Sequence, residues 1–110
     1  MLLLVFVDLS VVASFDSVLD RVGVISGGSI YPFAWNILLA ARNEGLGGTL
    51  TTFVGAQEPA LQALLGVPSR FAFAAMIPMG VPVKQLTKLS RKPVSEFASL
   101  ERFDGAPLDV

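Results

Sequence analysis

One segment near the middle of the chain constrains the fold most, because its pattern is that of a helix from end to end. The fifteen residues IYPFAWNILLAARNE (30–44) follow Ser29, a candidate capping hydroxyl, and are followed by Gly45. Pro32 lies in the first turn, where its missing N–H does no harm. Apolar residues recur at helical spacing, and a second apolar stripe contains Tyr31 and Trp35. We therefore predict a helix over residues 30–44 that is buried on more than one side.

Shorter segments predict strands and a second helix around it. Residues 2–7 form a continuous apolar run, typical of a strand covered on both faces. Residues 49–54 and 70–79 are rich in strand-forming residues, and residues 58–65 predict a short helix. The connection over 9–28 suggests a short helical turn around 15–19, and an extended C-terminal arm covers about 80–110. We expect one α+β domain over residues 1–110.

Composition excludes several classes of protein. At 110 residues with 53% hydrophobic content, a chain this small has little interior, so we expect part of its surface to meet another chain. The apolar run at 2–7 is far shorter than the ~20 residues of a membrane span and lacks the basic segment of a secretory signal, which favours the cytoplasm. The absence of cysteine and histidine removes thiolate metal sites and the commonest general base. A net charge of -1 argues against nucleic-acid binding.

The glycine cluster EGLGGTLTT (44–52) is the first candidate site. Gly45 is explained as the left-handed residue that ends the helix. Gly47 and Gly48 either form a simple turn into the next strand or allow a ligand to approach the backbone. The order helix, glycines, strand is not that of a phosphate loop, in which a helix follows the glycines.

Two side-chain groups are further candidates. Lys84, Lys88, Arg91 and Lys92 form either a solvated basic stretch or a phosphate site, which paired lysine and arginine suit. The aromatic residues between 31 and 35 are explained by packing in a core or an interface.

Three segments together carry a family resemblance. GGSIYPFAWNILLAARNEGLGGTLTT, FAFAAMIPMGVP and KLSRKPVSEF resemble the C-terminal half of the flavin-dependent nitroreductases, and the likeness runs from about Leu2 to Asp104. It implies an α+β nitroreductase-like fold, with a mixed sheet flanked by helices, and a homodimer with FMN at its interface. It also implies an oxidoreductase that passes two electrons from NADH or NADPH to a nitroaromatic, quinone or similar small-molecule acceptor.

The resemblance also assigns cofactor-binding residues. The family segment beside the flavin ring maps to Leu50, Thr51 and Thr52, preceded by Gly47 and Gly48. The basic pair that contacts the FMN phosphate maps to Lys88 and Arg91, with Lys92 a near-equivalent. Because a flavin supplies its own redox chemistry, the resemblance requires no catalytic side chain and no metal.

The family's N-terminal half has no counterpart in these residues. We therefore expect a partial nitroreductase-like domain whose partner is a second copy or a complementing N-terminal half. Such a chain alone should bind FMN weakly or not at all. The alternative function is a truncated, non-catalytic flavin-binding or interaction remnant.

Overall fold

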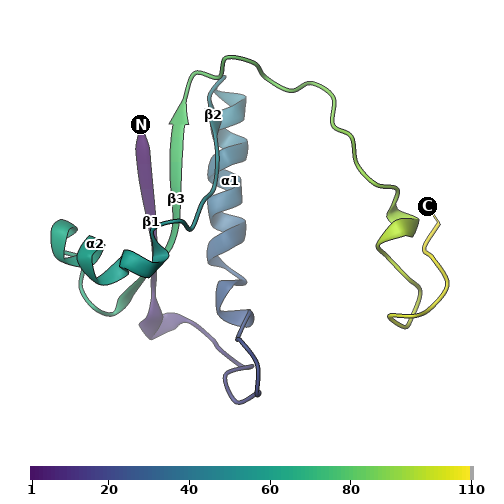
Figure 1. The fold of residues 1–110 in the computed structure, drawn as a ribbon, viewed down its shortest axis with the longest axis horizontal. Helices are drawn as coiled ribbons and strands as arrows, with labels where there is room; N and C mark the ends of the chain where they lie inside the picture. The colour runs from purple at the N-terminus through teal and green to yellow at the C-terminus, as the bar shows by residue number, and fades with distance from the viewer. Residues whose placement is uncertain (110) are drawn as a thin grey trace.

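The computed structural model describes residues 1–109 and shows a small α+β fold with a long C-terminal arm (Figure 1). Short 3-10 turns lie at Leu9–Val11, Ile25–Gly27, Gly55–Gln57 and Val94–Glu96. The α+β class expected from the sequence is confirmed. No helix among the described residues is both long and apolar enough to cross a membrane. The main elements are β1 (Leu2–Asp8), α1 (Ile30–Asn43), β2 (Gly47–Gly48), α2 (Glu58–Leu65) and β3 (Phe71–Gly80).

The sheet has the strand order β1-β3-β2, with β3 in the middle. Both neighbouring pairs are antiparallel, so the mixed sheet expected from the resemblance is wrong for the described residues. Since β1 and β2 both run opposite to β3, they share one direction. The chain between them contains α1. The insertion of β3 between them keeps them from forming a parallel pair.

The edge strand β2 begins earlier and is shorter than the strand expected at 49–54. A separate bridge between Thr51 and Met76 continues the register in which β2 pairs with β3. Between the two pieces, Thr49 lies opposite Pro78, whose carbonyl accepts the Thr49 N–H at 3.3 Å. Because proline has no N–H to return, the ladder is interrupted at this point. A proline in the central strand therefore divides the expected strand in two.

The helix α1 ends as expected but begins differently. The Ser29 side chain makes no capping hydrogen bond, and its backbone is already helical, so the expected hydroxyl cap is wrong. Gly45 has φ 78°, the left-handed conformation expected of a residue that terminates a helix. Ala34 and Ala41 are buried, whereas Tyr31 and Trp35 are 44% and 58% exposed. In this chain α1 is therefore buried on one side rather than on several.

The hydrophobic core lies between α1 and one face of the sheet. Most of its buried side chains are small, which lets the helix approach the strands closely. Ile77 is the largest side chain that is completely buried among the described residues. The core cluster consists of Val5, Ala34, Ala74, Ala75 and Ile77.

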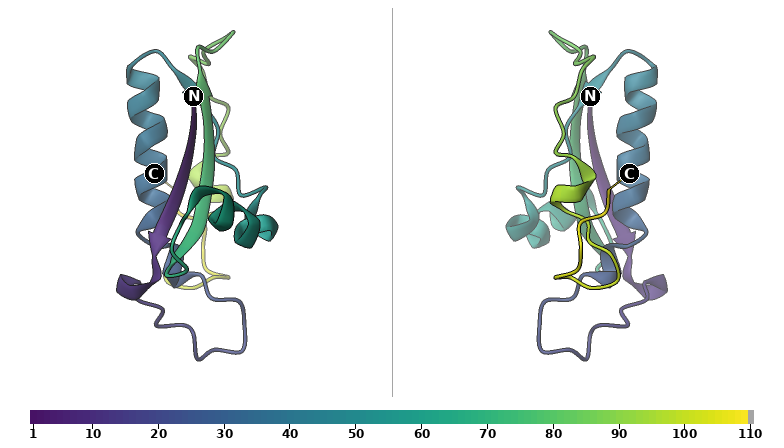
Figure 2. Two further views of the ribbon diagram at one scale, coloured as in Figure 1. Left: turned by 90° about the vertical axis from the view of Figure 1, so that its left-hand side faces the viewer. Right: turned by 90° about the vertical axis from the view of Figure 1, so that its right-hand side faces the viewer.

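The opposite face of the sheet is covered at one end, by α2. Figure 2 shows α1 and α2 on opposite sides of the sheet. Glu58 accepts the Phe73 N–H at 3.1 Å, and Gln62 donates to the Phe71 carbonyl at 2.6 Å, which fixes α2 to the start of β3. Leu2 at the other end is 56% exposed, and Val5 is the one buried residue of β1. The expectation that this strand is covered on both faces is therefore wrong.

The connection before α1 contains turns around 15–19 instead of the expected helical turn, and a buried carboxylate organises it. Asp16 accepts hydrogen bonds from the Val24 N–H and from Arg21, each at 2.8 Å. The Val24 N–H and then the Arg21 guanidinium hold the pKa of Asp16 below its ordinary value of 3.8. One ionised side chain thus closes the loop that leads into α1.

The arm, residues 81–109, leaves the end of β3 and runs away from the sheet and helices (Figure 1). Its last part folds on itself, with the Leu100 N–H donating to the Ala106 carbonyl at 2.8 Å. The Phe103 side chain is fully exposed. The radius of gyration is 17.9 Å, against about 13 Å for a compact chain of this length. The described chain therefore presents far more surface than a closed globule.

Candidate functional site

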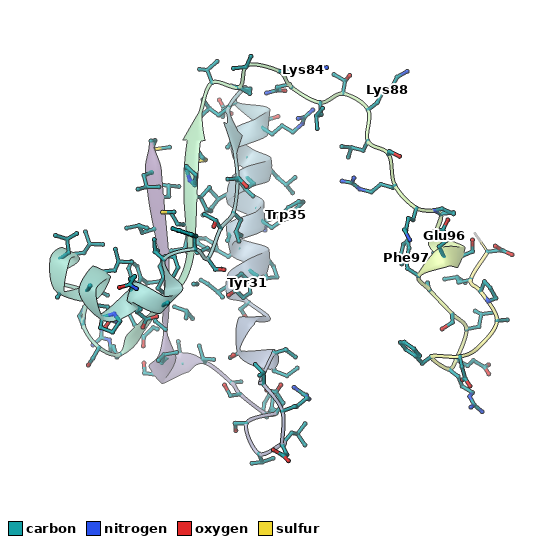
Figure 3. The ribbon with its side chains drawn as sticks, in the orientation of Figure 1. Tyr31, Trp35, Lys84, Lys88, Glu96 and Phe97 are labelled. Atoms are coloured by element: carbon teal, nitrogen blue, oxygen red, sulfur yellow. The ribbon has the colours of Figure 1, made fainter. Side chains whose placement is uncertain are left out.

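An open groove lies where the C-terminal end of α1, β2 and the first part of the arm meet. Its volume is about 530 Å³, within the range of small-molecule sites. Figure 3 shows Trp35 on the side of α1 on which the arm hangs. The groove is lined by Trp35, Leu38, Leu39, Arg42, Leu46, Gly47, Gly48, Pro82, Lys84, Gln85, Leu86, Thr87, Leu89 and Arg91.

Gly47 and Gly48, both expected at a cofactor site, lie in this groove. The structure also gives each a packing reason. A Cβ on Gly47 would stand 3.0 Å from the Cβ of Pro82. A Cβ on Gly48 would stand 2.8 Å from Met79 and 3.0 Å from Leu38. Close contact of the edge strand with its neighbours therefore explains these glycines without a ligand, while their backbone still forms part of the groove wall.

The three residues expected beside a flavin ring lie outside the groove lining. Leu50 packs against the core between α1 and the sheet. Thr51 uses both backbone groups in its bridge to Met76, at 2.9 Å and 2.8 Å. The Thr51 hydroxyl accepts the Phe53 N–H at 3.2 Å, and Thr52 follows on the exposed edge. These residues therefore do not join the glycines and the basic arm in one site.

The expected phosphate-binding pair is divided by the structure. Arg91 lines the groove, as does Lys84, whereas Lys88 does not. Figure 3 shows Lys88 farther along the arm than Lys84, pointing away from α1. Lys92 forms an ion pair with Glu96, with Nζ and Oε2 3.3 Å apart. The cations of the groove are therefore not the set that the resemblance assigned.

Arg42 is a groove residue that sequence reasoning missed. Its Nη2 donates to the Leu86 carbonyl at 2.7 Å, which ties the arm to α1. Trp35, interpreted from the sequence as a packing residue, lies on the same groove. The two residues are seven positions apart, about two helical turns, and this spacing was the available signal that they share one stripe of the helix.

The charge of the groove is uniformly positive. None of its lining residues is acidic, and within residues 1–109 none of Arg42, Lys84 and Arg91 forms an ion pair. The leucines and Trp35 supply an apolar wall beside these cations. Such a combination suits an anion that also carries an apolar or aromatic body.

A second groove, of about 500 Å³, lies at the other end of α1. It is lined mainly by apolar residues, including Val7, Ile30 and Phe73, together with Tyr31. No charged residue of the described chain lines it; the polar side chains of its lining are Ser26 and Tyr31, so it offers hydroxyl groups but no charge to a ligand.

The described residues include no group of three His, Cys, Asp or Glu side chains placed to hold a metal ion. Neither a protein-family model nor a curated protein matches this sequence.

Proposed function

We propose that this chain is an FMN-dependent oxidoreductase of the nitroreductase type, which passes two electrons from NAD(P)H to a nitroaromatic, a quinone or a similar acceptor. It works as a homodimer or with a complementing N-terminal half. One observation carries the proposal: the groove combines an indole and an apolar wall with three cations that have no acidic partner within residues 1–109. FMN has the matching chemistry, a flat aromatic ring joined to a phosphate dianion.

The residues present fit this cofactor by their donor chemistry. The Arg91 guanidinium offers a planar fork of donors to phosphate oxygens, and Lys84 adds a mobile point charge. Arg42 holds the arm over the helix through Leu86, so it positions both of these cations. When bound, FMN would supply the hydride chemistry, so the lack of histidine and cysteine is no obstacle.

The amount of exposed surface supports the proposal that this chain works together with a partner. The described chain exposes 8608 Å², almost half as much again as the about 5,900 Å² expected of a compact protein of this mass. The excess is greater than the about 800 Å² that each partner contributes to a standard interface. Large exposed side chains lie on α1, at Phe33 and Leu39, and on the arm, at Phe97 and Phe103. A second copy that covers Leu39 would also meet the groove, because Leu39 lines it.

The openness of the groove predicts weak FMN binding by the isolated chain. Apart from the half-buried Pro82, its arm wall is composed of exposed residues, and it is tied to α1 through the Arg42 bond to Leu86. Ordering this wall costs conformational entropy that a ligand must offset. We therefore expect binding that an equilibrium titration detects but that does not persist through gel filtration.

The experiment measures FMN binding and NADPH oxidation in parallel, with a quinone as acceptor. We expect a saturable rise in FMN anisotropy with the chain alone. Turnover should appear in the dimer, or after co-expression with a family N-terminal half. The absence of FMN binding under all these conditions would overturn the proposal. Binding without turnover would support the alternative, a non-catalytic flavin-binding chain.

A further inference from the structure

The flat ring of the cofactor needs a surface in the groove, and we infer that this surface is the indole of Trp35. The inference rests on the proposed function and goes beyond it, because the resemblance placed the ring beside Leu50, Thr51 and Thr52. Trp35 is the single aromatic residue among those that line the groove, and it is 58% exposed. An exposed indole face beside apolar side chains is the preferred partner of a planar aromatic system.

The alternative place for the ring, along residues 50–52, has its central residue already paired with β3 and is separated from the groove. The Thr51 N–H already donates to Met76, and the Thr51 carbonyl accepts from it. The Leu50 side chain is directed into the core. A ring on this edge would also lie outside the groove, apart from the cations that hold the phosphate.

The spacing along α1 separates the indole from the end of the groove at which Arg42 attaches the arm. Trp35 and Arg42 are seven residues apart, which is about 10 Å along the helix axis. An extended ribityl chain spans such a distance between a ring at Trp35 and a phosphate at the basic end. In the view of Figure 3, Trp35 on α1 lies below Lys84, which stands at the start of the arm. The ring and the phosphate therefore both meet the chemistry that suits them.

Trp35 also lies on the exposed stripe of α1 that a second copy would cover. If it were a contact between copies and not a ring partner, its fluorescence would follow protein concentration and would be indifferent to FMN. This difference separates the two roles.

The experiment uses the full chain and its one tryptophan as the probe. Trp35 emission, corrected for absorption by the flavin, is titrated with FMN, with riboflavin and with inorganic phosphate. We expect saturable quenching by FMN, weaker quenching by riboflavin and none by phosphate. A Trp35→Ala variant should bind FMN about tenfold more weakly or worse, as loss of a base–aromatic stack does, while Trp35→Phe keeps most of the affinity. Phe33→Ala is the matched control, because Phe33 is an exposed aromatic of α1 that does not line the groove.

The outcomes separate this inference from the proposed function. FMN binding by anisotropy without quenching of Trp35, or with unchanged affinity in Trp35→Ala, overturns the ring assignment and leaves the FMN proposal standing. An equal loss in Phe33→Ala also overturns it, because the effect would then come from the helix surface in general. The absence of both quenching and anisotropy change, with the chain alone and with a co-expressed N-terminal half, overturns the two together.

Discussion

The substitution Gly48→Ala tests whether close packing against neighbouring residues explains the glycine at this position of β2. Gly48 lies in β2 opposite Met79, and its φ is not in the left-handed region. A methyl group there would stand 2.8 Å from Met79, 3.0 Å from Leu38 and 3.2 Å from the Pro78 carbonyl oxygen. The first two neighbours are flexible side chains, but the third is backbone of the central strand.

The magnitude follows from two opposing effects. Forcing an extra methyl group into packed surroundings costs about 1–3 kcal/mol. Replacing glycine by alanine also reduces the freedom of the unfolded chain, which returns about 0.4–1 kcal/mol. We expect the free energy of unfolding to fall by roughly 0.5–2 kcal/mol.

Gly80→Ala is the matched control for this prediction. Gly80 pairs with the neighbouring residue Gly47 in the same ladder, and an added Cβ would meet no atom within 4 Å. This variant should be unchanged or more stable by up to about 1 kcal/mol. Urea unfolding followed by far-UV circular dichroism measures both, with the slope of the transition checked for change. Equal stability of the two variants would refute the packing explanation of Gly48.

Three further predictions concern stability. Ile77→Val should lower the free energy of unfolding by about 0.5–1.5 kcal/mol and Ile77→Ala by about 2–5 kcal/mol, because Ile77 is completely buried; a loss below this range for Ile77→Ala would place the core elsewhere. Glu58→Ala leaves the Phe73 N–H without its acceptor and should lower the free energy of unfolding in urea by about 1–3 kcal/mol. Glu58→Gln keeps an acceptor oxygen and should cost less, and the reverse order would contradict the role of this hydrogen bond. The pKa of Asp16 is lowered by the Val24 N–H and Arg21. The contribution of Asp16 to stability is therefore present above pH 3.8 and is lost as the pH falls through the lower folded-state pKa. Acid unfolding of Asp16→Asn should lack this pH-dependent loss of stability, and an unchanged pH profile would exclude the role.

The helices were predictable because their signals are local. The apolar spacing and Gly45 indicated α1 almost to its ends, and Gly66, with φ 68°, terminates α2 where the sequence indicated. The Ser29 cap failed because a hydroxyl before a helix signals a cap without ensuring that its side chain bonds.

The strands show where local reasoning ends. Residues 49–54 have strand propensity, but their pairing was decided by Pro78, a residue more than twenty positions away that lies opposite Thr49. The burial of β1 was overestimated because a continuous apolar run does not reveal whether both faces are covered. Strand order depends on such long-range partners, and the mixed sheet was expected from the resemblance and not from any pairing signal in these residues.

Only part of the site was predictable from the sequence, because the groove is formed by segments that are far apart in the chain. The glycine cluster and the basic arm were both recognised in the sequence, and the structure brings Gly47, Gly48 and Arg91 to one groove. It leaves Lys88 outside, although its neighbours Thr87 and Leu89 line the groove, because the path of the exposed arm decides which of its side chains turn toward α1. Arg42 and Trp35 were missed as site residues because an amphipathic helix explains such side chains equally well without a ligand.

The comparison of Arg91→Ala with Lys88→Ala tests the phosphate end of the groove most directly. Both variants remove one exposed cation from the same stretch of the arm, and Arg91 alone of the two lines the groove. FMN titrations followed by anisotropy should show an affinity about tenfold or more lower for Arg91→Ala, because a charge-assisted hydrogen bond is lost, and a change below about twofold for Lys88→Ala. Equal affinities in the two variants, whether both reduced or both unchanged, would contradict the assignment of this groove to FMN.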